Sequence, residues 1–409
     1  MGGGGGNAGA QTVTCRVLSI STLFPSSARP GFGLFVARQF DSVAARGDVE
    51  LELICPVARP VWPLSMLRAP SPGHFTQPSD RTAAFPVHYV PFSNIPAIST
   101  RWNPALIARA VLPLARRLHA ERSFDVVDAQ FFFPEGPAAA RIARELGLPL
   151  SITARGSDVH LWGQDRAARP QILEAAKQAA GIRAVSAALR ADMIALGMPE
   201  ERIEVHYTGL DHSRFKPVPR GEARATIAAD AGLGVSAEGP LFVAVGNLIP
   251  LKGQALAIEA LSGLPEAQLV IAGQGPERAA LAMKAAELGV GDRVIFAGSL
   301  APDTLALLLS AADAMVLPSE REGLANAWVE ALACGTPIVI PDVGGAREVV
   351  CDPSAGRLAA RNPAAIAGAM ADLLANPPTQ AAVAANAARF SWEANAAQIA
   401  AHYQRIAAD

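Results

Sequence analysis

The sequence has few of the features that mark disulfide-bonded, zinc-binding and membrane-spanning proteins. Its four cysteines, at positions 15, 55, 334 and 351, form no C-x-x-C pair. Such scattered cysteines are typical of the reduced core of a cytoplasmic protein rather than of a disulfide or zinc framework. The seven histidines show no metal-ligand spacing. No apolar run reaches the ~20 residues of a membrane-spanning helix.

Charge is also scarce, and its two signs nearly balance. Charged residues make up 18% of the 409 residues, and the formal net charge is -2. This balance indicates neither a nucleic acid nor an acidic partner. The sequence contains no G-x-S-x-G, no H-E-x-x-H and no Walker loop, so these motifs assign no function. The glycine-rich residues 1–12 lack the apolar core of a signal peptide, and we expect them to form a flexible tail.

Hydrophobic residues, by contrast, make up 51% of the chain and follow a regular order. From Thr12 onward, apolar runs of strand length alternate with amphipathic segments of helix length, which predicts an α/β protein with parallel sheets. The expected strands of the N-terminal half cover residues 13–20, 50–56, 87–91, 125–130, 149–154, 182–186 and 203–207. Those of the C-terminal half cover residues 241–245, 268–272, 294–297, 314–318 and 338–341.

Prolines interrupt this alternation near residues 215–219 and predict a linker between two domains. We therefore expect an N-terminal domain over residues 13–216 and a C-terminal domain over residues 217–388. A final helical segment covers residues 389–409. With two α/β domains of similar size, function is expected in a cleft between them.

The most informative segment is residues 319–335, which follows an apolar strand and ends in a helix. Glu322 and Glu330 lie there with seven residues between them. Backbone N–H groups at a helix start after a parallel strand suit a phosphate, and a carboxylate accepts hydrogen bonds from neighbouring hydroxyls. A nucleotide sugar offers both kinds of group.

Lys252 lies beside Gly253 at another expected helix start. A lysine in that position suits a diphosphate, because a unit-charge pair at ~4 Å is worth ~4 kcal/mol before desolvation. Gly31 and Gly33 follow the first strand, where they either let the backbone approach a ligand or simply break a loop. The glycines of residues 272–277 are interpreted as a tight turn, because Arg278 replaces the third glycine of a dinucleotide fingerprint.

Polar clusters also follow two strands of the N-terminal half. Residues 155–158, including Arg155 and Asp158, come directly after one strand, and Glu135 follows three phenylalanines after another. Aromatic faces beside a carboxylate suit an acceptor sugar, but they equally suit a packed core. The basic residues 101–122 form either a helix on an anionic membrane or a packed helix with a solvated face, and base rates favour the packed helix.

Together these segments resemble the retaining GT-B glycosyltransferases with the E-x7-E motif, also described as glycosyltransferase family 4 or glycosyl transferases group 1. The matching segments, in chain order, are residues 21–35, 155–158, 208–217, 245–253, 272–276, 296–298 and 318–337. The resemblance implies two Rossmann-like α/β domains whose parallel sheets face each other across a cleft. It also implies a last helix that returns to the N-terminal domain.

The resemblance further implies individual roles. Glu330 would hold the donor ribose, Glu322 the transferred sugar, and Lys252 the leaving phosphate, so that Glu322 and Lys252 are the expected catalytic residues. The other implied donor-binding residues are Gly31, Gly33, Asn247, Gly298, Gly323, Leu324, Ala325 and Asn326, and the implied acceptor-side residues are Glu135, Arg155 and Asp158. Asn247 stands where many relatives have an arginine, and Arg155 where many have a histidine.

The implied activity is transfer of a sugar from a nucleotide-diphosphate sugar to a glycan or lipid-linked acceptor with retention of configuration. The implied setting is bacterial exopolysaccharide or cell-envelope synthesis, in the cytoplasm or at the inner face of the membrane. No metal or other cofactor is expected, which agrees with the lack of an Asp-x-Asp signature. Two alternatives are a non-catalytic nucleotide-sugar or glycan binding protein and a sugar-nucleotide epimerase of the same fold.

Overall fold

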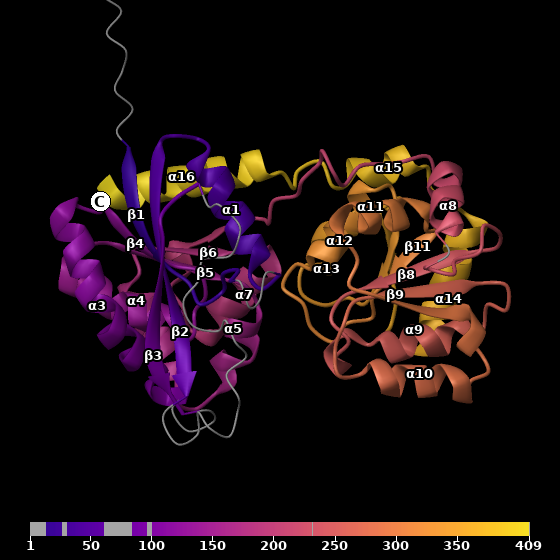
Figure 1. The fold of residues 1–409 in the computed structure, drawn as a ribbon, viewed down its shortest axis with the longest axis horizontal. Helices are drawn as coiled ribbons and strands as arrows, with labels where there is room; N and C mark the ends of the chain where they lie inside the picture. Colours follow the sequence, from indigo (N-terminus) through magenta and orange to yellow (C-terminus); the bar gives the residue numbers. More distant parts are fainter. Residues whose placement is uncertain (1–13, 27–30, 61–83, 96–99, 231, 409) are drawn as a thin grey trace, which may run out of the picture. The chain divides into compact units, whose positions relative to one another are not determined.

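The computed structural model describes residues 14–26, 31–60, 84–95, 100–230 and 232–408, so the expected tail at 1–12 lies outside the described residues. The chain divides into two compact units (Figure 1). The first contains the residues up to Ala184, Met193–His206 and the residues from Asn395 onward, and the second contains Val185–Asp192 and Tyr207–Ala394.

The first unit is built on a parallel sheet with the strand order β3-β2-β1-β4-β5-β6-β7. Strands β4, β5 and β6 are buried along their whole length, as expected for a parallel sheet covered on both faces. The strands are β1 (Cys15–Ile20), β2 (Val49–Pro60), β3 (Val87–Asn94), β4 (Val126–Ala129), β5 (Leu150–Ala154), β6 (Gly181–Ala184) and β7 (Ile203–Val205). The helices are α1 (Leu34–Ala44), α3 (Asn103–Glu121), α4 (Glu135–Leu146), α5 (Ser157–His160), α6 (Ala168–Gln178), α7 (Ala187–Leu196) and α16 (Trp392–Ala408). Helices α7 and α16 span the divisions between the units.

The last helix, α16, packs on the first unit, as expected from the resemblance (Figure 1, yellow). Its buried residues Ile399, Tyr403 and Ile406 share one hydrophobic cluster with Val17 and Phe40 of the first strand and helix. The two ends of the described chain therefore stabilise the same core.

The second unit has a parallel sheet with the order β10-β9-β8-β11-β12-β13. Its strands are β8 (Leu241–Val245), β9 (Gln268–Ala272), β10 (Val294–Gly298), β11 (Ala314–Val316), β12 (Ile338–Ile340) and β13 (Gly356–Leu358). Its helices are α8 (Arg220–Ala229), α9 (Gln254–Leu261), α10 (Arg278–Glu287), α11 (Pro302–Ala311), α12 (Asn326–Ala333), α13 (Ala346–Val349), α14 (Pro363–Ala375) and α15 (Gln380–Ala385). Strand β13 was not expected, because three residues with a glycine carry little strand pattern.

The division between the units differs in place from the expected linker. The chain passes into the second unit between His206 and Tyr207 rather than after residue 216. It returns to the first unit between Ala394 and Asn395 rather than after residue 388. The physical reason is burial, since Leu210, Phe215 and Phe390 all belong to the hydrophobic core of the second unit. The prolines near residue 217 thus lie inside that unit.

Helix α3 is packed against the first unit through its apolar face. Ile107, Val111 and Leu118 are buried, whereas the arginines of this segment are exposed. Several of these arginines form ion pairs: Arg116 with Glu145 at 2.5 Å, Arg117 with Glu121 at 3.8 Å, and Arg122 with Glu50 at 2.6 Å. This arrangement supports the packed helix of the two interpretations given above.

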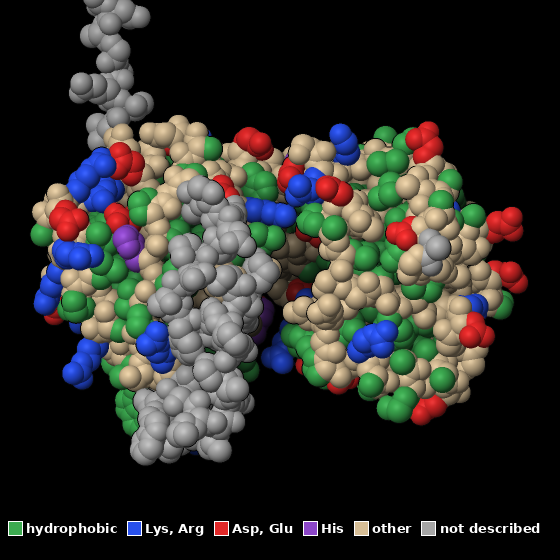
Figure 2. Space-filling model, in the orientation of Figure 1, with side chains coloured by type: hydrophobic (Ala, Val, Ile, Leu, Met, Phe, Trp, Pro, Cys, Tyr) green, Lys and Arg blue, Asp and Glu red, His purple; other side chains and the backbone are tan. Residues whose placement is uncertain are grey.

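Among the described residues, every helix is too short or too polar to span a lipid bilayer. On the face shown in Figure 2, acidic and basic side chains are interspersed over each unit. This distribution agrees with the nearly balanced composition.

Candidate active site

The strand order of the second unit reverses between β8 and β11. At such a switch point the loops after two neighbouring parallel strands run in opposite directions and leave room for a ligand beyond the carboxyl ends of the strands. Lys252 follows β8 and Glu322 follows β11. The two residues expected to be catalytic are therefore supplied by the two strands of the switch point.

Lys252 and Glu322 are in direct contact. The Nζ atom of Lys252 donates to Oε1 of Glu322 at 2.5 Å, and the two side chains are only 19% and 11% exposed. The sequence predicted separate partners for them, a phosphate for the lysine and a sugar for the carboxylate. In the structure they form one polar pair, which places a cation and an anion side by side at the end of the sheet.

The loop that carries Glu322 is fixed by backbone contacts. The N–H of Glu320 donates to the carbonyl of Leu251 at 2.8 Å, and the N–H of Gly345 donates to the carbonyl of Gly323 at 2.7 Å. Gly253 has φ +68°, and a Cβ atom there would lie 2.3 Å from the carbonyl oxygen of Pro318. The loop after β11 is thus held against the turn that carries the lysine.

Helix α12 begins immediately after this loop, at Asn326. Its N-cap, Ala325, provides no side-chain hydrogen bond to the first N–H groups of the helix. Uncapped N–H groups and the helix dipole favour an anion at this end. Glu330 lies further along the same helix and is half-buried. One short helix therefore carries both the expected phosphate contacts and the expected ribose contact.

The ends of β8, β9 and β10 bring further expected donor residues close together. The N–H of Gly246 donates to the carbonyl of Ala272, and the N–H of Gly273 donates to the carbonyl of Gly298 at 2.7 Å. A Cβ atom on Gly273 would lie 1.9 Å from the Gly246 carbonyl oxygen, so the backbones after β8 and β9 approach each other closely. Residues 273–277 alone join β9 to α10, in agreement with the short turn expected there. Asn247 is exposed at this edge.

The sheet of the first unit reverses its order between β1 and β4, and Glu135 lies at that point. Its Oε1 atom accepts hydrogen bonds from the N–H of Thr22 at 2.6 Å and from the Thr22 hydroxyl at 2.5 Å. Oε2 is buried and has no hydrogen-bond partner among the described residues. Burial raises the pKa of Glu135 to about 8, although the bonds from Thr22 oppose this shift.

Arg155 and Asp158 belong to the same unit and are engaged by protein groups. Arg155 donates from Nε to the carbonyl of Gln130 at 2.9 Å and from Nη2 to Oε1 of Gln39 at 2.9 Å. The carboxylate of Asp158 accepts from the N–H groups of Phe132, Arg155 and Gly156. Burial raises the pKa of Asp158 and lowers that of Arg155 to about 10. These charges stabilise the loops after β4 and β5.

The two glycines after β1 differ in their surroundings. Gly33 has φ +70°, and a Cβ atom there would lie 2.4 Å from the carbonyl carbon of Leu23, so its own loop already requires a glycine. Gly31 is exposed, and a Cβ atom there would have no described atom within 4 Å. Contact of either glycine with a donor remains a prediction.

Comparison with known proteins identifies the family to which the chain belongs. The sequence model described as "Glycosyl transferases group 1" matches residues 228–390, and the model "Glycosyltransferase Family 4" matches residues 67–214. A D-inositol 3-phosphate glycosyltransferase from Frankia alni is 32% identical over 313 residues, which are 70% of this chain and 75% of that protein. The chain belongs to the group 1, family 4 glycosyltransferases.

Other relatives of this glycosyltransferase match in part. The D-inositol 3-phosphate glycosyltransferase of Mycolicibacterium vanbaalenii is 36% identical over 226 residues, covering 51% of this chain. The match spans about half of that relative's length, 49%. The activity named for that relative is therefore not transferred to this chain.

Solved structures show the same fold. Sucrose-phosphate synthase from Thermosynechococcus elongatus superimposes with a TM-score of 0.76 at 21% identity, covering 96% of this chain and 99% of that chain. The Anabaena protein HepE, in complex with UDP and glucose, superimposes with a TM-score of 0.72 at 21% identity, covering 96% and 100%. The glycosyltransferase therefore has the expected GT-B architecture of two parallel-sheet α/β domains.

The structure adds residues to the site that the sequence did not indicate. Thr22 binds Glu135, and Gln39 and Gln130 bind Arg155. A threonine after a strand and two glutamines on separate elements carry no motif. Only the strand-order reversal, which the sequence does not specify, brings Thr22 and Glu135 together.

Proposed function

We propose that this glycosyltransferase transfers a sugar from a nucleotide-diphosphate sugar to a hydroxyl group of a glycan or lipid-linked acceptor, with retention of anomeric configuration. The observation that carries the proposal is the contact between Lys252 and Glu322 at the β8–β11 switch point, beside the uncapped start of α12. A donor with a diphosphate next to a sugar matches a cation next to a carboxylate.

In this proposal the donor lies along α12. The first N–H groups of the helix and the ammonium of Lys252 bind the diphosphate, and Glu330 accepts hydrogen bonds from the ribose hydroxyls. Glu322 contacts the transferred sugar and stabilises the positive charge that develops at the anomeric carbon. The ammonium of Lys252 and the first N–H groups of α12 offset the negative charge of the leaving diphosphate, and the proposal includes no metal ion.

The bond changes follow from this arrangement. The bond from the anomeric carbon to the diphosphate oxygen breaks, and a new bond forms from the acceptor hydroxyl oxygen to the same carbon. The acceptor proton passes to the leaving diphosphate oxygen. Lys252 stabilises the negative charge that this oxygen gains while the bond is breaking, so its interaction strengthens in the transition state.

The donor and acceptor are proposed only by class. The Anabaena protein was solved with UDP and glucose, so UDP-sugars are the first donors to test. Two relatives are named D-inositol 3-phosphate glycosyltransferase, so phosphorylated polyols are the first acceptors to test. Cell-envelope glycans are the next acceptors to test. We also propose a cytoplasmic location. Contact between α3 and an anionic membrane is a separate proposal, which co-sedimentation with anionic vesicles at low salt tests.

The experiment measures transfer and donor binding together. The wild-type chain is screened against UDP-, GDP- and ADP-sugars with an acceptor panel, and the anomeric configuration of the product is determined by NMR. Glu330→Gln should weaken donor binding by about tenfold or more, because it replaces a charged hydrogen-bond acceptor. Donor binding without turnover over the whole acceptor panel would instead favour the non-catalytic binding protein, and inversion of configuration would contradict retention.

A further inference from the structure

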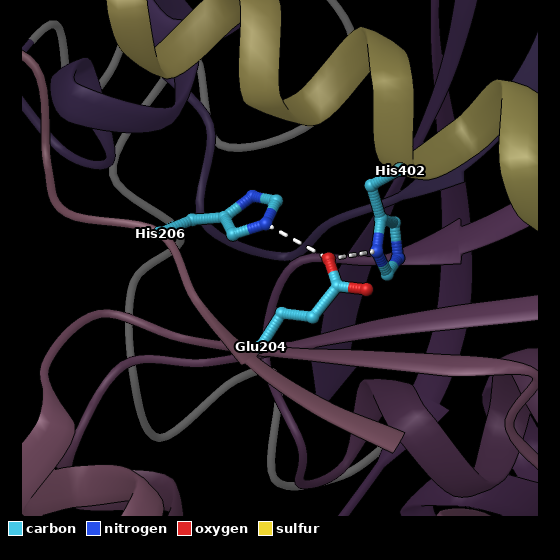
Figure 3. Close-up of side chains that lie close together, drawn as sticks. All are labelled: Glu204, His206 and His402. Atoms are coloured by element: carbon cyan, nitrogen blue, oxygen red, sulfur yellow. Dashed lines mark hydrogen bonds and ion pairs between the residues drawn. The ribbon is translucent and has the colours of Figure 1, made fainter. Parts of the chain in front are cut away.

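Two histidines and a glutamate form a cluster where α16 meets the edge strand β7 of the first unit (Figure 3). None of the three belongs to the site assigned above. Glu204 is on β7, His206 directly follows that strand, and His402 is on α16. The Oε2 atom of Glu204 lies 3.0 Å from Nε2 of His206 and 3.1 Å from Nδ1 of His402. Both histidines are buried, with exposed fractions of 8% and 2%.

The three side chains have the composition and spacing of a metal site. One ligating atom from each lies within 4.8 Å of the other two. Among the described residues, these three form the group of His, Cys, Asp or Glu side chains close enough together to hold one metal ion. Two imidazole nitrogens with one carboxylate oxygen are a donor set that Zn²⁺ prefers. The sequence did not reveal it, because the two histidines are far apart in the chain and meet only when α16 packs on the first unit.

The hydrogen bonds around His402 conflict with one another. Its Nδ1 atom faces the carboxylate of Glu204 at 3.1 Å, which only accepts, and Nη2 of Arg405 at 3.3 Å, which only donates. A ring nitrogen carries either a proton or a lone pair, so either tautomer leaves one of these contacts unfavourable. Arg405 also donates to Oε1 of Glu204, so a positive group already lies against two members of the cluster.

We propose that Glu204, His206 and His402 bind one Zn²⁺ ion, with Arg405 displaced towards solvent. Arg405 has a side chain that is 46% exposed, so it can leave without unpacking the core. The Nε2 atom of His402 lies 3.2 Å from the Ser151 hydroxyl and would donate its proton there once Nδ1 binds the ion. Such a bond to the second ring nitrogen is the usual support of a metal-binding histidine.

Binding would connect the last helix to the edge of the first sheet. Glu204 and His206 come from the β7 segment and His402 from α16, so an ion bound by all three stabilises the packing of the returning helix. Because the site forms only when α16 is docked, Zn²⁺ should stabilise the folded chain. This inference is independent of the glycosyl-transfer proposal and is tested without substrate.

The first unit offers a matched control for this site. His88 Nε2 lies 2.8 Å from Oε1 of Glu52, and Arg16 Nη2 contacts Oε2 of the same carboxylate at 2.7 Å. This group has the glutamate, one histidine and the arginine, but no second histidine has been found beside it among the described residues. His88→Asn therefore removes a histidine–glutamate pair without touching the proposed site.

The test titrates ZnCl₂ into the chelator-treated full-length chain by calorimetry and follows the thermal midpoint, with MgCl₂ as a second ion. We expect one Zn²⁺ per chain, a higher midpoint with Zn²⁺ than with Mg²⁺, and Co²⁺ absorption bands typical of nitrogen and oxygen ligands. His206→Asn and Glu204→Gln should each lower Zn²⁺ affinity at least tenfold, whereas His88→Asn should not. Arg405→Gln should raise the affinity, because it removes the competing cation.

Two results would overturn the proposal. One is equal Zn²⁺ affinity in the wild type, His206→Asn and His88→Asn, which would mean an adventitious ion only. The other is no Zn²⁺ binding by either the wild type or Arg405→Gln. The arginine variant keeps the proposal falsifiable if a histidine variant fails to fold, because all three proposed ligands remain in it.

Discussion

The ammonium of Lys252 and the carboxylate of Glu322 lie 2.5 Å apart, although seventy positions separate them in the sequence. They meet because β8 and β11 are neighbours at the point where the strand order of the second sheet reverses. In the proposed reaction the lysine acts on the leaving diphosphate and the carboxylate on the sugar. We therefore expect the bond that breaks, from the anomeric carbon to the diphosphate oxygen, to lie beside this pair.

Replacing Lys252 by methionine should lower kcat by about 10²–10³-fold, because one preorganised charge that stabilises the transition state is lost. The matched control is Lys284→Met, which removes a lysine that pairs with Glu259 at 3.0 Å on the same unit, away from the switch point. Initial rates at saturating donor measure the effect. Similar losses in the two variants would show that Lys252 has no special role.

The double variant Lys252→Met/Glu322→Gln should lose much less activity than the product of the two single losses. Residues in direct contact that act on one transition state are not independent, and each single substitution also leaves its partner with an altered neighbour. A double-mutant cycle on kcat/KM measures the coupling. Fully multiplicative losses would mean that the observed contact has no part in catalysis.

Gly253→Ala should destabilise the second unit more than Gly289→Ala does. The two glycines have nearly the same left-handed conformation, with φ +68° and +67°, so both substitutions incur a backbone cost of roughly 1–2 kcal/mol. Only at Gly253 would the new Cβ meet a backbone oxygen, that of Pro318 at 2.3 Å, while nothing lies within 4 Å at Gly289. The additional loss should be about 1–3 kcal/mol in urea unfolding, and equal losses would contradict this packing.

The free energy of unfolding of Glu135→Gln, relative to that of the wild type, should increase as pH rises from about 5 to about 8. Burial raises the pKa of this carboxyl from 4.5 to about 8, so in this interval the folded state holds a proton that the unfolded state has released. The wild type therefore loses stability as pH rises, whereas glutamine does not titrate. Urea midpoints at pH 5.5 and pH 8.5 measure the difference.

The control for this pH dependence is Glu145→Gln, which changes an exposed glutamate of the same helix, α4. We expect its effect on the midpoint to be nearly the same at both pH values. A stability difference between Glu135→Gln and the wild type that does not change with pH would contradict a raised pKa at Glu135.

The sequence predicted most strands to within a few residues, because fully buried parallel strands appear as short apolar runs. Strands β8 and β9 were predicted with their observed bounds. What it did not predict are relationships between distant segments. The Lys252–Glu322 contact, the Thr22–Glu135 hydrogen bonds and the His206–Glu204–His402 cluster all depend on strand order or on the docking of α16.

The E-x7-E spacing placed two carboxylates at the ends of one loop–helix segment, and the structure has that segment. The structure also shows how the segment is fixed, through the bonds from Glu320 to Leu251 and from Gly345 to Gly323. Such backbone contacts do not depend on side-chain identity, so no residue pattern indicates them. The buried partners of Arg155 include the side chain of Gln39, which comes from a distant element, so no local residue pattern indicated this contact either.

Transfer by two glutamine variants of one loop tests the central claim most directly. Glu320 and Glu322 are two positions apart, but Glu320 is 53% exposed beside Arg321, whereas Glu322 is 11% exposed against Lys252. With a donor and acceptor that the wild type uses, Glu322→Gln should reduce transfer about 100-fold or more, and Glu320→Gln should leave it nearly unchanged. Equal activity of the two variants would contradict the proposed active site.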